Sequence, residues 1–587
     1  MRRSYLAPLL VALAAGLVPA AGIRADVRAQ AAALAAGAGE LQEPAAARAA
    51  LDRARDAQRD FERRRRRSFP RAAFTHARCD EHIGRFCLTH DGDDEWEPTP
   101  ERPEVGAARR ALLATLDSVA TLAPHDGWLL GQRVSYRLEA GEPERALALA
   151  RACGADRPWC LALEGLVLHR QGRTREAEEA FDEVLARLPA ADACRWLDIT
   201  HLLEGKDRDR YEDLPCGSAE RDTFERRVWL LADPLWSEPG LERRAEHLAR
   251  RVRVALQTDA ASGYGVPWGR DLDELTVRYG WPEGWDVAWR HDPGIRTERA
   301  IQAHRSPTAQ RLVPTGLADD DDGPAWRLED EEPRSAWSPP GGPIDDTLDP
   351  QIAVFRRAGR RLVVAALDPA GPVPDAAGRE GREGTPDGRV CRAHPSLRLA
   401  DRTGIVAAGE GDGRVLRALE PSGSEARWAG VETRCEDGDG SARARVPLRV
   451  GSTWMSDVLL FDPGQLLPGT LDAALEAVRG SNRVQPAAVL GVFWEWYGPP
   501  EPQSVTVELT REDRSFLRKA LEWTGLAGRR IERAGVRWVD PGADEGRGRA
   551  IRLELPELEP GRYRLTLHVQ SAQVGRVLAT RELVVER

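Results

Sequence analysis

The chain has 587 residues, of which 42% are hydrophobic and 30% are charged, and its formal net charge is −10. This length predicts about three or four domains, and the charge is too small for the length to indicate a nucleic-acid partner. Beyond the N-terminal segment, no apolar run reaches the roughly 18 residues of a membrane-spanning helix. We therefore expect a multidomain globular protein whose mature chain has no transmembrane segment.

Residues 1–29 have the pattern of an export signal. Arg2 and Arg3 form a basic start, residues 5–22 are apolar, and the small residues that follow allow cleavage between residues 21 and 29. An uncleaved membrane anchor is the alternative. The pattern favours an exported protein, either periplasmic or secreted.

Residues 30–67 are rich in Ala and Arg and predict a helix that ends in five consecutive arginines, residues 63–67. These arginines could bind an anionic surface or be cut by a protease. Cations also suit the C-terminal end of a helix dipole, and we favour this structural interpretation.

Eight cysteines, all beyond the signal, indicate disulfides in an exported chain. Pairing of neighbours in the sequence is our prediction: Cys79 with Cys87, Cys153 with Cys160, Cys194 with Cys216, and Cys391 with Cys435. A zinc site is the alternative for the first pair, because two thiolates and two imidazoles lie close together there, at Cys79, His82, Cys87 and His90. We expect the disulfide, and no metal or other cofactor.

Two helices joined by a turn are predicted over residues 161–189. The second helix has an apolar face at helical spacing, the turn contains a glycine, and a proline ends the pair; these residues are Ala177, Ala180, Phe181, Val184, Leu188, Gly172 and Pro189. A single helical hairpin cannot bury such a face, so it needs neighbouring helices.

The hairpin resembles a tetratricopeptide repeat. Small, turn, small, aromatic and proline positions of that family are occupied by Gly165, Gly172, Ala177, Phe181 and Pro189. An earlier copy is marked by three residues that precede their counterparts by 31 positions, against a family period of about 34: Gly141, Ala146 and Pro158. The resemblance implies stacked hairpins whose inner helices line a concave surface. Residues between the stacking positions are then expected to face a partner, namely Glu164, His169 and Arg170. Alternatively, the repeats only support the β modules and pack their concave face against the same chain. An ordinary helical bundle is the alternative.

Several later segments resemble the uncharacterised GWxTD-domain proteins of bacteria. They lie at residues 229–250, 271–285, 351–368, 456–463 and 490–498. The pentapeptide that names the family is absent, since Gly-Trp at 284–285 is followed by Asp-Val-Ala. The family has no established activity, so the resemblance implies architecture and no chemistry.

The most catalytic-looking pair is Glu246 with His247, because a carboxylate and an imidazole can share a proton. Neighbours on a helix point apart, however, so we interpret His247 as a structural hydrogen-bonding residue. We expect Glu246 to pair with Arg250, one turn away, on the solvent side. The common hydrolase and nucleotide-binding motifs are missing, and no catalytic residue is assigned.

Residues 316–350 are rich in Pro, Gly and acids and predict a linker. Part of the segment matches a calcium-binding loop at Asp320, Asp322, Gly323 and Glu329, but the first loop position is Ala318. We therefore favour a solvated linker without a metal.

After residue 350 the hydrophobic period changes to two, with strict alternation over residues 505–509, 551–555 and 563–569. A short helix is predicted within residues 466–479. Residues 558–563 resemble the corner of immunoglobulin-like sandwiches, in which a Tyr hydroxyl bonds back to the main chain; an ordinary hairpin turn is the alternative. These patterns predict antiparallel β-sandwich modules.

The predicted fold class is therefore multidomain, α followed by β. The expected parts are a signal peptide (1–29), an N-terminal helical and Cys-containing segment (30–105), a tetratricopeptide-like domain (106–260), a connecting GWxTD-like segment (261–315), a linker (316–350), a β domain (351–465) and a C-terminal β-sandwich (466–587).

These observations favour an exported, non-enzymatic scaffold that binds another protein or peptide through its helical repeats. Two other classes remain open. One is a secreted, hydrolase-like enzyme with a site in residues 260–350, and the other is an envelope- or carbohydrate-binding β module.

Overall fold

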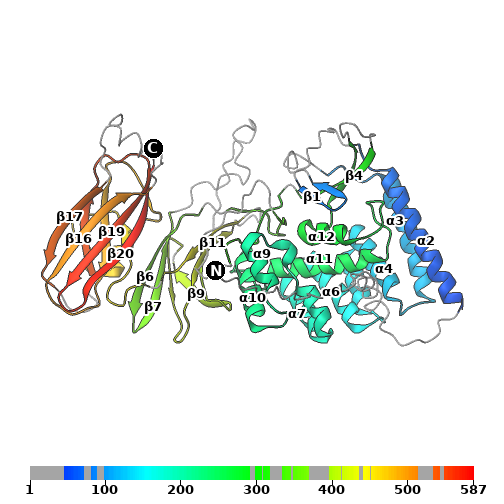
Figure 1. Ribbon diagram of the computed structural model, residues 1–587, viewed down its shortest axis with the longest axis horizontal. Coiled ribbons are helices and arrows are strands. Elements are labelled where there is room, and N and C mark those ends of the chain that lie inside the picture. The colour runs from blue at the N-terminus through cyan, green and yellow to red at the C-terminus, as the bar shows by residue number, and fades with distance from the viewer. Residues whose placement is uncertain are drawn as a thin grey trace, which may run out of the picture.

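The computed structural model describes residues 45–71, 81–88, 98–290, 298–306, 308–317, 334–345, 348–368, 395–411, 413–434, 441–449, 451–512, 533–542 and 548–586. A helical part comes first in the chain and a β part follows, as the sequence predicts (Figure 1). The expected signal peptide and the calcium-loop residues Asp320, Asp322, Gly323 and Glu329 lie outside the described residues.

The helical part contains the α-helices α2 to α12 and a short 3₁₀ helix. Their bounds are α2 (Ala45–Arg67), α3 (Pro103–Ala120), α4 (Gly127–Glu139), α5 (Pro143–Arg151), α6 (Arg157–Arg170), α7 (Thr174–Arg187), α8 (Ala190–Leu197), η2 (Thr200–Leu202), α9 (Gly205–Glu212), α10 (Ala219–Ala232), α11 (Glu242–Thr258) and α12 (Arg270–Tyr279). None of the helices in the described ranges is long and apolar enough to cross a membrane.

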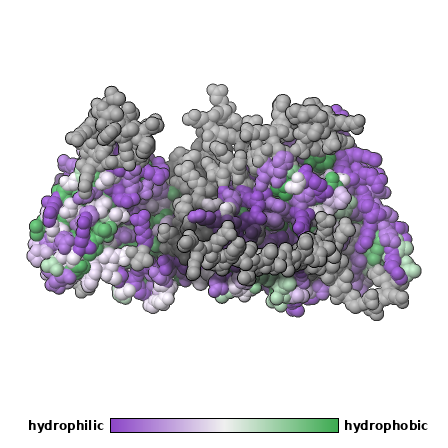
Figure 2. Space-filling view, viewed as in Figure 1, coloured by the Kyte–Doolittle hydropathy of each residue, from purple (hydrophilic) through white to green (hydrophobic). Residues whose placement is uncertain are grey.

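Helix α2 packs with α3 and α4 at the right-hand edge of the molecule, where Figure 2 shows a largely hydrophilic surface. Its inner face carries a polar network: Gln58 donates to the Tyr136 hydroxyl at 2.8 Å, and Tyr136 donates to Glu62 at 2.7 Å. Burial raises the pKa of Glu62, although the neighbouring charge of Arg65 opposes that shift. Arg65 also pairs with Glu139 at 3.1 Å, so the polar side of α2 is fixed to α4.

Helices α6 and α7 form the predicted hairpin. Gly172 adopts a φ of +71° in the turn, a conformation that glycine takes without strain. Gly165 lies directly against the Phe181 ring: a Cβ atom at this position would lie 2.6 Å from a ring carbon. Phe181 is fully buried, so the glycine allows the two helices to pack closely.

Helix α11 covers one side of this helical layer, because it packs against α4, α6 and α7. Its apolar stripe shares one hydrophobic core with the hairpins, through Leu248, Ala249, Val252 and Leu256. The helices that were expected to line an open surface therefore contact a later segment of the same chain.

One turn between α10 and α11 holds the helical part to the β part. Glu432 on β11 (Trp428–Arg434) accepts hydrogen bonds from the backbone N–H groups of Trp236 and Ser237, at 2.7 and 2.8 Å. Arg445 on β12 (Ser441–Pro447) lies over the Trp236 ring, 3.9 Å from its centre, and pairs with Glu432. Gly430 leaves room for that ring, since a Cβ atom there would lie 2.5 Å from it. We call these contacts the junction.

Part of the predicted linker is packed into the fold. In the range 334–345, Ala336 and Trp337 are buried, and the backbone N–H of Gln310 donates to the Trp337 carbonyl at 2.9 Å. Strand β5 (Ile344–Asp345) then pairs in parallel with β12. The prediction of a solvated linker is wrong for this range, because a few non-periodic apolar residues anchor it despite its composition.

The remaining strands are β1 (Glu81–Ile83), β2 (Phe86–Leu88), β3 (Gly284–Arg290), β4 (Glu298–His304), β6 (Gln351–Arg357), β7 (Arg360–Ala366), β8 (Ser396–Ala400), β9 (Ile405–Gly411), β10 (Val415–Leu419), β13 (Leu459–Phe461), β14 (Arg483–Val484), β15 (Val489–Glu495), β16 (Gln503–Arg511), β17 (Arg533–Asp540), β18 (Gly548–Glu554), β19 (Gly561–Ser571) and β20 (Gly575–Val585). The short helix α13 (Leu471–Glu476) falls within the predicted range 466–479. An eight-stranded sheet has the order β5-β12-β11-β8-β9-β10-β7-β6.

Strands β6 and β7 are buried on both faces. Val354 and Val363 face a core that includes residues of β8 and β11. Phe355 and Val364 belong to a second core, with residues of β13, β15 and α13. Burial on both faces accounts for the nearly continuous apolar runs of these strands.

The C-terminal part consists of two facing sheets, with the orders β13-β15-β18 and β14-β20-β19-β16-β17. Val505 pairs with Val569 and Leu509 with Leu565, and all four side chains point into the core between the sheets. The alternation predicted from the sequence is confirmed here. The Tyr563 hydroxyl donates to the Glu559 carbonyl at 3.0 Å, which is the predicted bond back to the main chain. Strand β13 pairs with β15, so this sheet includes residues on both sides of the expected boundary at 465.

Candidate functional site

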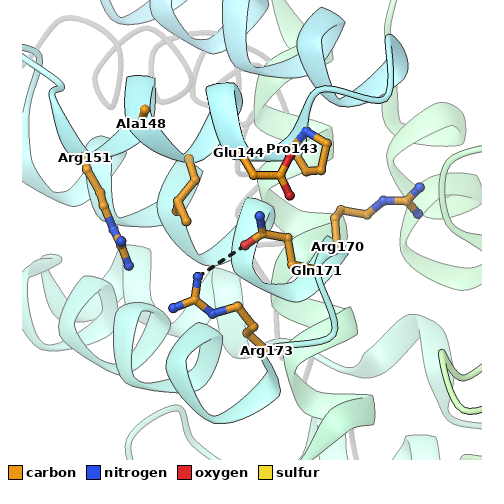
Figure 3. Close-up of a pocket in the computed structure, with 8 residues that line it drawn as sticks. Pro143, Glu144, Ala148, Arg151, Arg170, Gln171 and Arg173 are labelled. Carbon is orange, nitrogen blue, oxygen red and sulfur yellow. Dashed lines mark hydrogen bonds between the residues drawn. The ribbon is translucent and has the colours of Figure 1, made fainter.

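An open pocket of about 750 Å³ lies between α5 and the turn that joins α6 to α7 (Figure 3). This volume falls within the range of about 300–1,000 Å³ that is usual for ligand sites. Figure 3 shows Arg151 on one side and Arg170 on the other, with Gln171 and Arg173 between them. The full lining is Pro143, Glu144, Leu147, Ala148, Arg151, Arg170, Gln171 and Arg173.

The backbone places these polar residues on a fixed turn. Pro143 begins α5, at a position where its missing N–H costs nothing. At the end of α6, the N–H groups of Gly172 and Arg173 donate to the carbonyls of His169 and Leu168 at 2.9 and 3.0 Å. This helix-ending arrangement fixes the backbone of residues 170–173 beside α5, and Figure 3 shows the Arg170 side chain extending away from Gln171, Arg173 and Arg151.

The arginines of the pocket differ in how far they are already engaged. The Arg151 Nε donates to Glu164 at 2.7 Å, and Arg173 pairs with Glu176. The Arg173 Nη1 reaches the Gln171 side-chain oxygen at 3.4 Å. Arg170 is exposed and forms no ion pair or hydrogen bond with the described part of the chain, so its guanidinium is available to a ligand.

The three residues expected to face a partner have different positions. Arg170 lines the pocket, and Glu164 is half-buried and holds Arg151. His169 is buried, with 7% of its surface exposed, so the expectation that it faces a ligand is wrong. Its Nε2 lies 2.6 Å from a Glu246 carboxylate oxygen, and its ring lies 6.2 Å from that of Trp337.

Glu246 and Arg250 pair as predicted, but they do so in the interior and not on the solvent side. Arg250 is 3% exposed, and it donates to the backbone carbonyls of Arg278 and Ala336 at 2.7 and 2.9 Å. Burial alone would raise the pKa of Glu246, but the charge of Arg250 and the hydrogen bond of His169 hold it well below its usual value. The carboxylate thus joins α6 to α11.

His247 is the structural hydrogen-bonding residue that the sequence predicts. The centre of its ring lies 5.2 Å from that of Trp229, and its Nε2 is 3.1 Å from the Trp196 carbonyl. Burial, together with the charges of Arg251 and Arg243, holds its pKa well below the usual range, so the imidazole is neutral. Burial also lowers the pKa of Arg243 to about 9, and its two terminal nitrogens have no hydrogen-bond partner among the described residues.

The segment considered for a hydrolase site contributes a network of ion pairs. Arg278 pairs with Glu274 at 3.1 Å, and Arg334 pairs with Glu81 at 3.2 Å and with Glu274 at 3.3 Å. These contacts connect α12 to β1 and to the segment that begins at residue 334. Their arrangement as a cross-link between three chain segments gives them a structural role.

Two of the predicted disulfides are formed, Cys153–Cys160 and Cys194–Cys216. The first joins the end of α5 to α6 and the second joins α8 to the loop before α10. Cys79, Cys391 and Cys435 lie outside the described residues, so the other two predicted pairs stay predictions.

The alternative zinc site also stays a prediction. His82 and Cys87 are opposite each other in the β1–β2 pair, whereas Cys79 and His90 fall outside the described ranges. Within those ranges, no group of three or more His, Cys, Asp or Glu residues is arranged to hold a metal ion.

Sequence reasoning missed the junction at Trp236 and the burial of Trp337. The junction had one visible signal, a Leu-Ala-Asp-Pro turn followed by tryptophan, but its partners lie about 200 positions further along the chain. Trp337 had no periodic neighbours to mark it as buried. The signal that could have found both features is a tryptophan inside a polar or loop-like segment, since such large side chains are commonly buried against other parts of the chain.

No family model matches the chain, and no curated protein matches it. Among solved structures, it is similar to a red sea bream transglutaminase, with 10% identity, 55% of this chain and 43% of the other covered, and a TM-score of 0.12. A mutated three-Ig fragment of titin has 10% identity, coverage of 41% and 66%, and a TM-score of 0.11. A protein from Corynebacterium diphtheriae described as membrane anchored has 9% identity, coverage of 44% and 63%, and a TM-score of 0.14. The chain spans less than two-thirds of each, and similarity at this level indicates neither a fold nor a function.

Proposed function

We propose that the protein is an exported, non-enzymatic scaffold that binds another protein or peptide through its helical hairpins. In this proposal the hairpins are tetratricopeptide-like repeats, the C-terminal sheets are immunoglobulin-like modules, and the chain is related to the GWxTD-domain proteins. The observation that carries the proposal is the open pocket at α5 and the α6–α7 turn, with Arg170 available on its rim.

The location of the pocket changes which surface binds. A concave groove formed by the first helix of each hairpin would be the usual binding surface of such repeats. Here α11 packs against α4, α6 and α7, and its side chains fill the shared core. The proposed partner therefore binds at the pocket beside α5. Helix α11 packs against the other side of the helical layer and stabilises it.

Other features agree with a scaffold. Glu246 and His247, the pair that looked most catalytic in the sequence, are engaged inside the fold: Glu246 pairs with His169 and Arg250, and His247 contacts the Trp196 carbonyl. The junction fixes the helical part to the β part, so a partner held at α5 would keep a defined position relative to the sheets. The two disulfides among the described residues lie in the helical part, in agreement with export.

Site-specific photocrosslinking on the full mature chain tests the proposal. A benzophenone amino acid would replace Ala148, which is exposed and lines the pocket, and the protein would be illuminated in an envelope extract of its source. The matched control carries the same group at Arg110, an exposed position on α3. We expect a crosslinked partner at position 148 that is absent at position 110 and diminished by Arg170→Glu. The same products at both positions, or none at 148, would contradict the proposal.

A further inference from the structure

We infer that the pocket beside α5 recognises an acidic peptide segment of its partner, one that combines carboxylates with an apolar side chain. The inference rests on the proposed function and specifies the chemistry of the ligand. Three arginines and one glutamate, Glu144, are the charged residues of the lining. Arg151 and Arg173 are paired with Glu164 and Glu176, so Arg170 is the lining cation that holds no ion pair with the described residues. Charge complementarity therefore selects an anionic ligand.

The geometry of the guanidinium groups favours carboxylates. Arg170 has all its donors available, and the hydrogen bond of Arg151 to Glu164 uses only its Nε. Arginine presents a planar fork that binds a carboxylate through two parallel hydrogen bonds. Because Arg151 and Arg170 lie on opposite sides of the pocket (Figure 3), a single small anion would engage one of them, whereas two carboxylates on one chain could engage both.

The apolar part of the lining excludes a simple anion as the matching ligand. Pro143, Ala148 and the mostly buried Leu147 are the apolar lining residues on α5, and their side chains have no donor to offer. Inorganic phosphate would leave this surface in water, but an aliphatic side chain next to the carboxylates would cover it. The pocket is open and not enclosed, which suits an extended peptide that enters and leaves it.

Glu144 provides an internal check on this interpretation. Its side chain is exposed on the same rim and would repel the carboxylates of the ligand. If the pocket selects by charge, removal of this one negative charge must strengthen binding, while reversal of the Arg170 charge must weaken it. A purely apolar site would respond to neither change.

The experiment measures fluorescence anisotropy of two labelled octapeptides with the full mature protein. One probe alternates leucine with pairs of glutamate, and the other has glutamine in place of every glutamate. We expect the glutamate probe to bind about tenfold more tightly, and its binding to weaken as salt is raised from 50 to 500 mM, about a threefold decrease in screening length.

The variants then assign the binding to this pocket. Arg170→Glu should reduce affinity for the glutamate probe by about fivefold, and Glu144→Gln should increase it by about twofold. The matched control Arg110→Glu, with the same change of charge on α3, should leave it unchanged. Circular dichroism is used to check that each variant is folded. Because Arg170 is exposed, its replacement should leave the core intact.

Each contrary result has a distinct meaning. Equal binding of the two probes overturns the inference and leaves the proposed function standing, because the pocket would then bind peptides without regard to charge. Failure of both probes, while position 148 still crosslinks a partner, also overturns only the inference. Binding of phosphatidylglycerol vesicles that Arg170→Glu abolishes, without peptide binding, would assign the pocket to lipid headgroups instead. If both the probes and the crosslinking fail, the proposed function fails as well.

Discussion

The junction offers the sharpest test of how the two parts of the molecule are held together. Glu432 is 1% exposed. It accepts two backbone hydrogen bonds and forms an ion pair with Arg445. The substitution Glu432→Gln keeps the shape, but removes the carboxylate that pairs with Arg445 and sets an amide donor against the N–H groups of the turn. Loss of one partner of a buried pair costs about 3–5 kcal/mol, and we expect a decrease of this size in the free energy of unfolding.

A double-mutant cycle separates this pair from general disruption. Arg445→Met removes the cation and keeps much of the volume, so the double variant leaves no unpaired buried charge. Its cost should be smaller than the sum of the two single costs by about 1–3 kcal/mol. Urea unfolding of the full chain, followed by circular dichroism and by tryptophan fluorescence, measures all four proteins.

The pH dependence follows from the same carboxylate. Burial acts to raise the pKa of Glu432, but the charge of Arg445 and the hydrogen bonds of the turn outweigh it, and the pKa lies below its ordinary value of 4.5. Its stabilisation is therefore present above pH 4.5 and is lost as the pH falls through the folded-state pKa. The difference between wild type and Glu432→Gln should shrink over that interval. Additive costs at neutral pH, or a change below about 0.5 kcal/mol, would refute the assignment of the junction to this ion pair.

Three further predictions concern the cores. Leu565→Ala should cost about 2–5 kcal/mol in urea unfolding and Arg564→Ala less than about 0.5, because only the leucine is buried; equal costs would mean that the register of β19 is wrong. Gly165→Ala should cost about 1–3 kcal/mol in thermal unfolding, since its Cβ would press on the Phe181 ring, and an unchanged Tm would speak against that contact. The pKa of Glu246 lies below 4.5 in the folded protein, so the wild type should lose free energy of unfolding as the pH falls through that lowered value, and Glu246→Gln should lose less. The same pH dependence in both proteins would count against the buried pairing of Glu246.

Local patterns in the sequence predicted what depends on near neighbours. The hairpin of α6 and α7 follows from apolar spacing and from Gly172, which ends α6. The inward positions of β16 and β19 follow from alternation, and the bond of Tyr563 follows from a short turn motif. The pairing of two neighbouring cysteine couples likewise needed only short separations in the chain.

The candidate site depended on distant packing and was predicted only in part. A periodic apolar stripe identifies one buried face of α11. The helix is also covered on other sides, so Arg243 and Arg250 are buried although their place in the sequence predicts a solvent-exposed face. His169 is buried for the same reason, since Glu246 and Trp337 approach it from later segments. Arg170, the next residue and the last of α6, is not covered by these later segments; it is exposed and lines the pocket.

The position of α11 also restricts how this protein can change during evolution. Open arrays of helical hairpins lengthen or shorten by duplication or loss of a unit, because each unit contacts only its neighbours. Here a single helix from later in the chain contacts α4, α6 and α7 together. Insertion of one more hairpin would shift these helices relative to α11 and to the turn between α10 and α11 that contacts the β part. The number of hairpins is therefore fixed by a segment outside the array, and variation among descendants of this chain should appear as substitutions on the rim of the pocket, not as changes in repeat number.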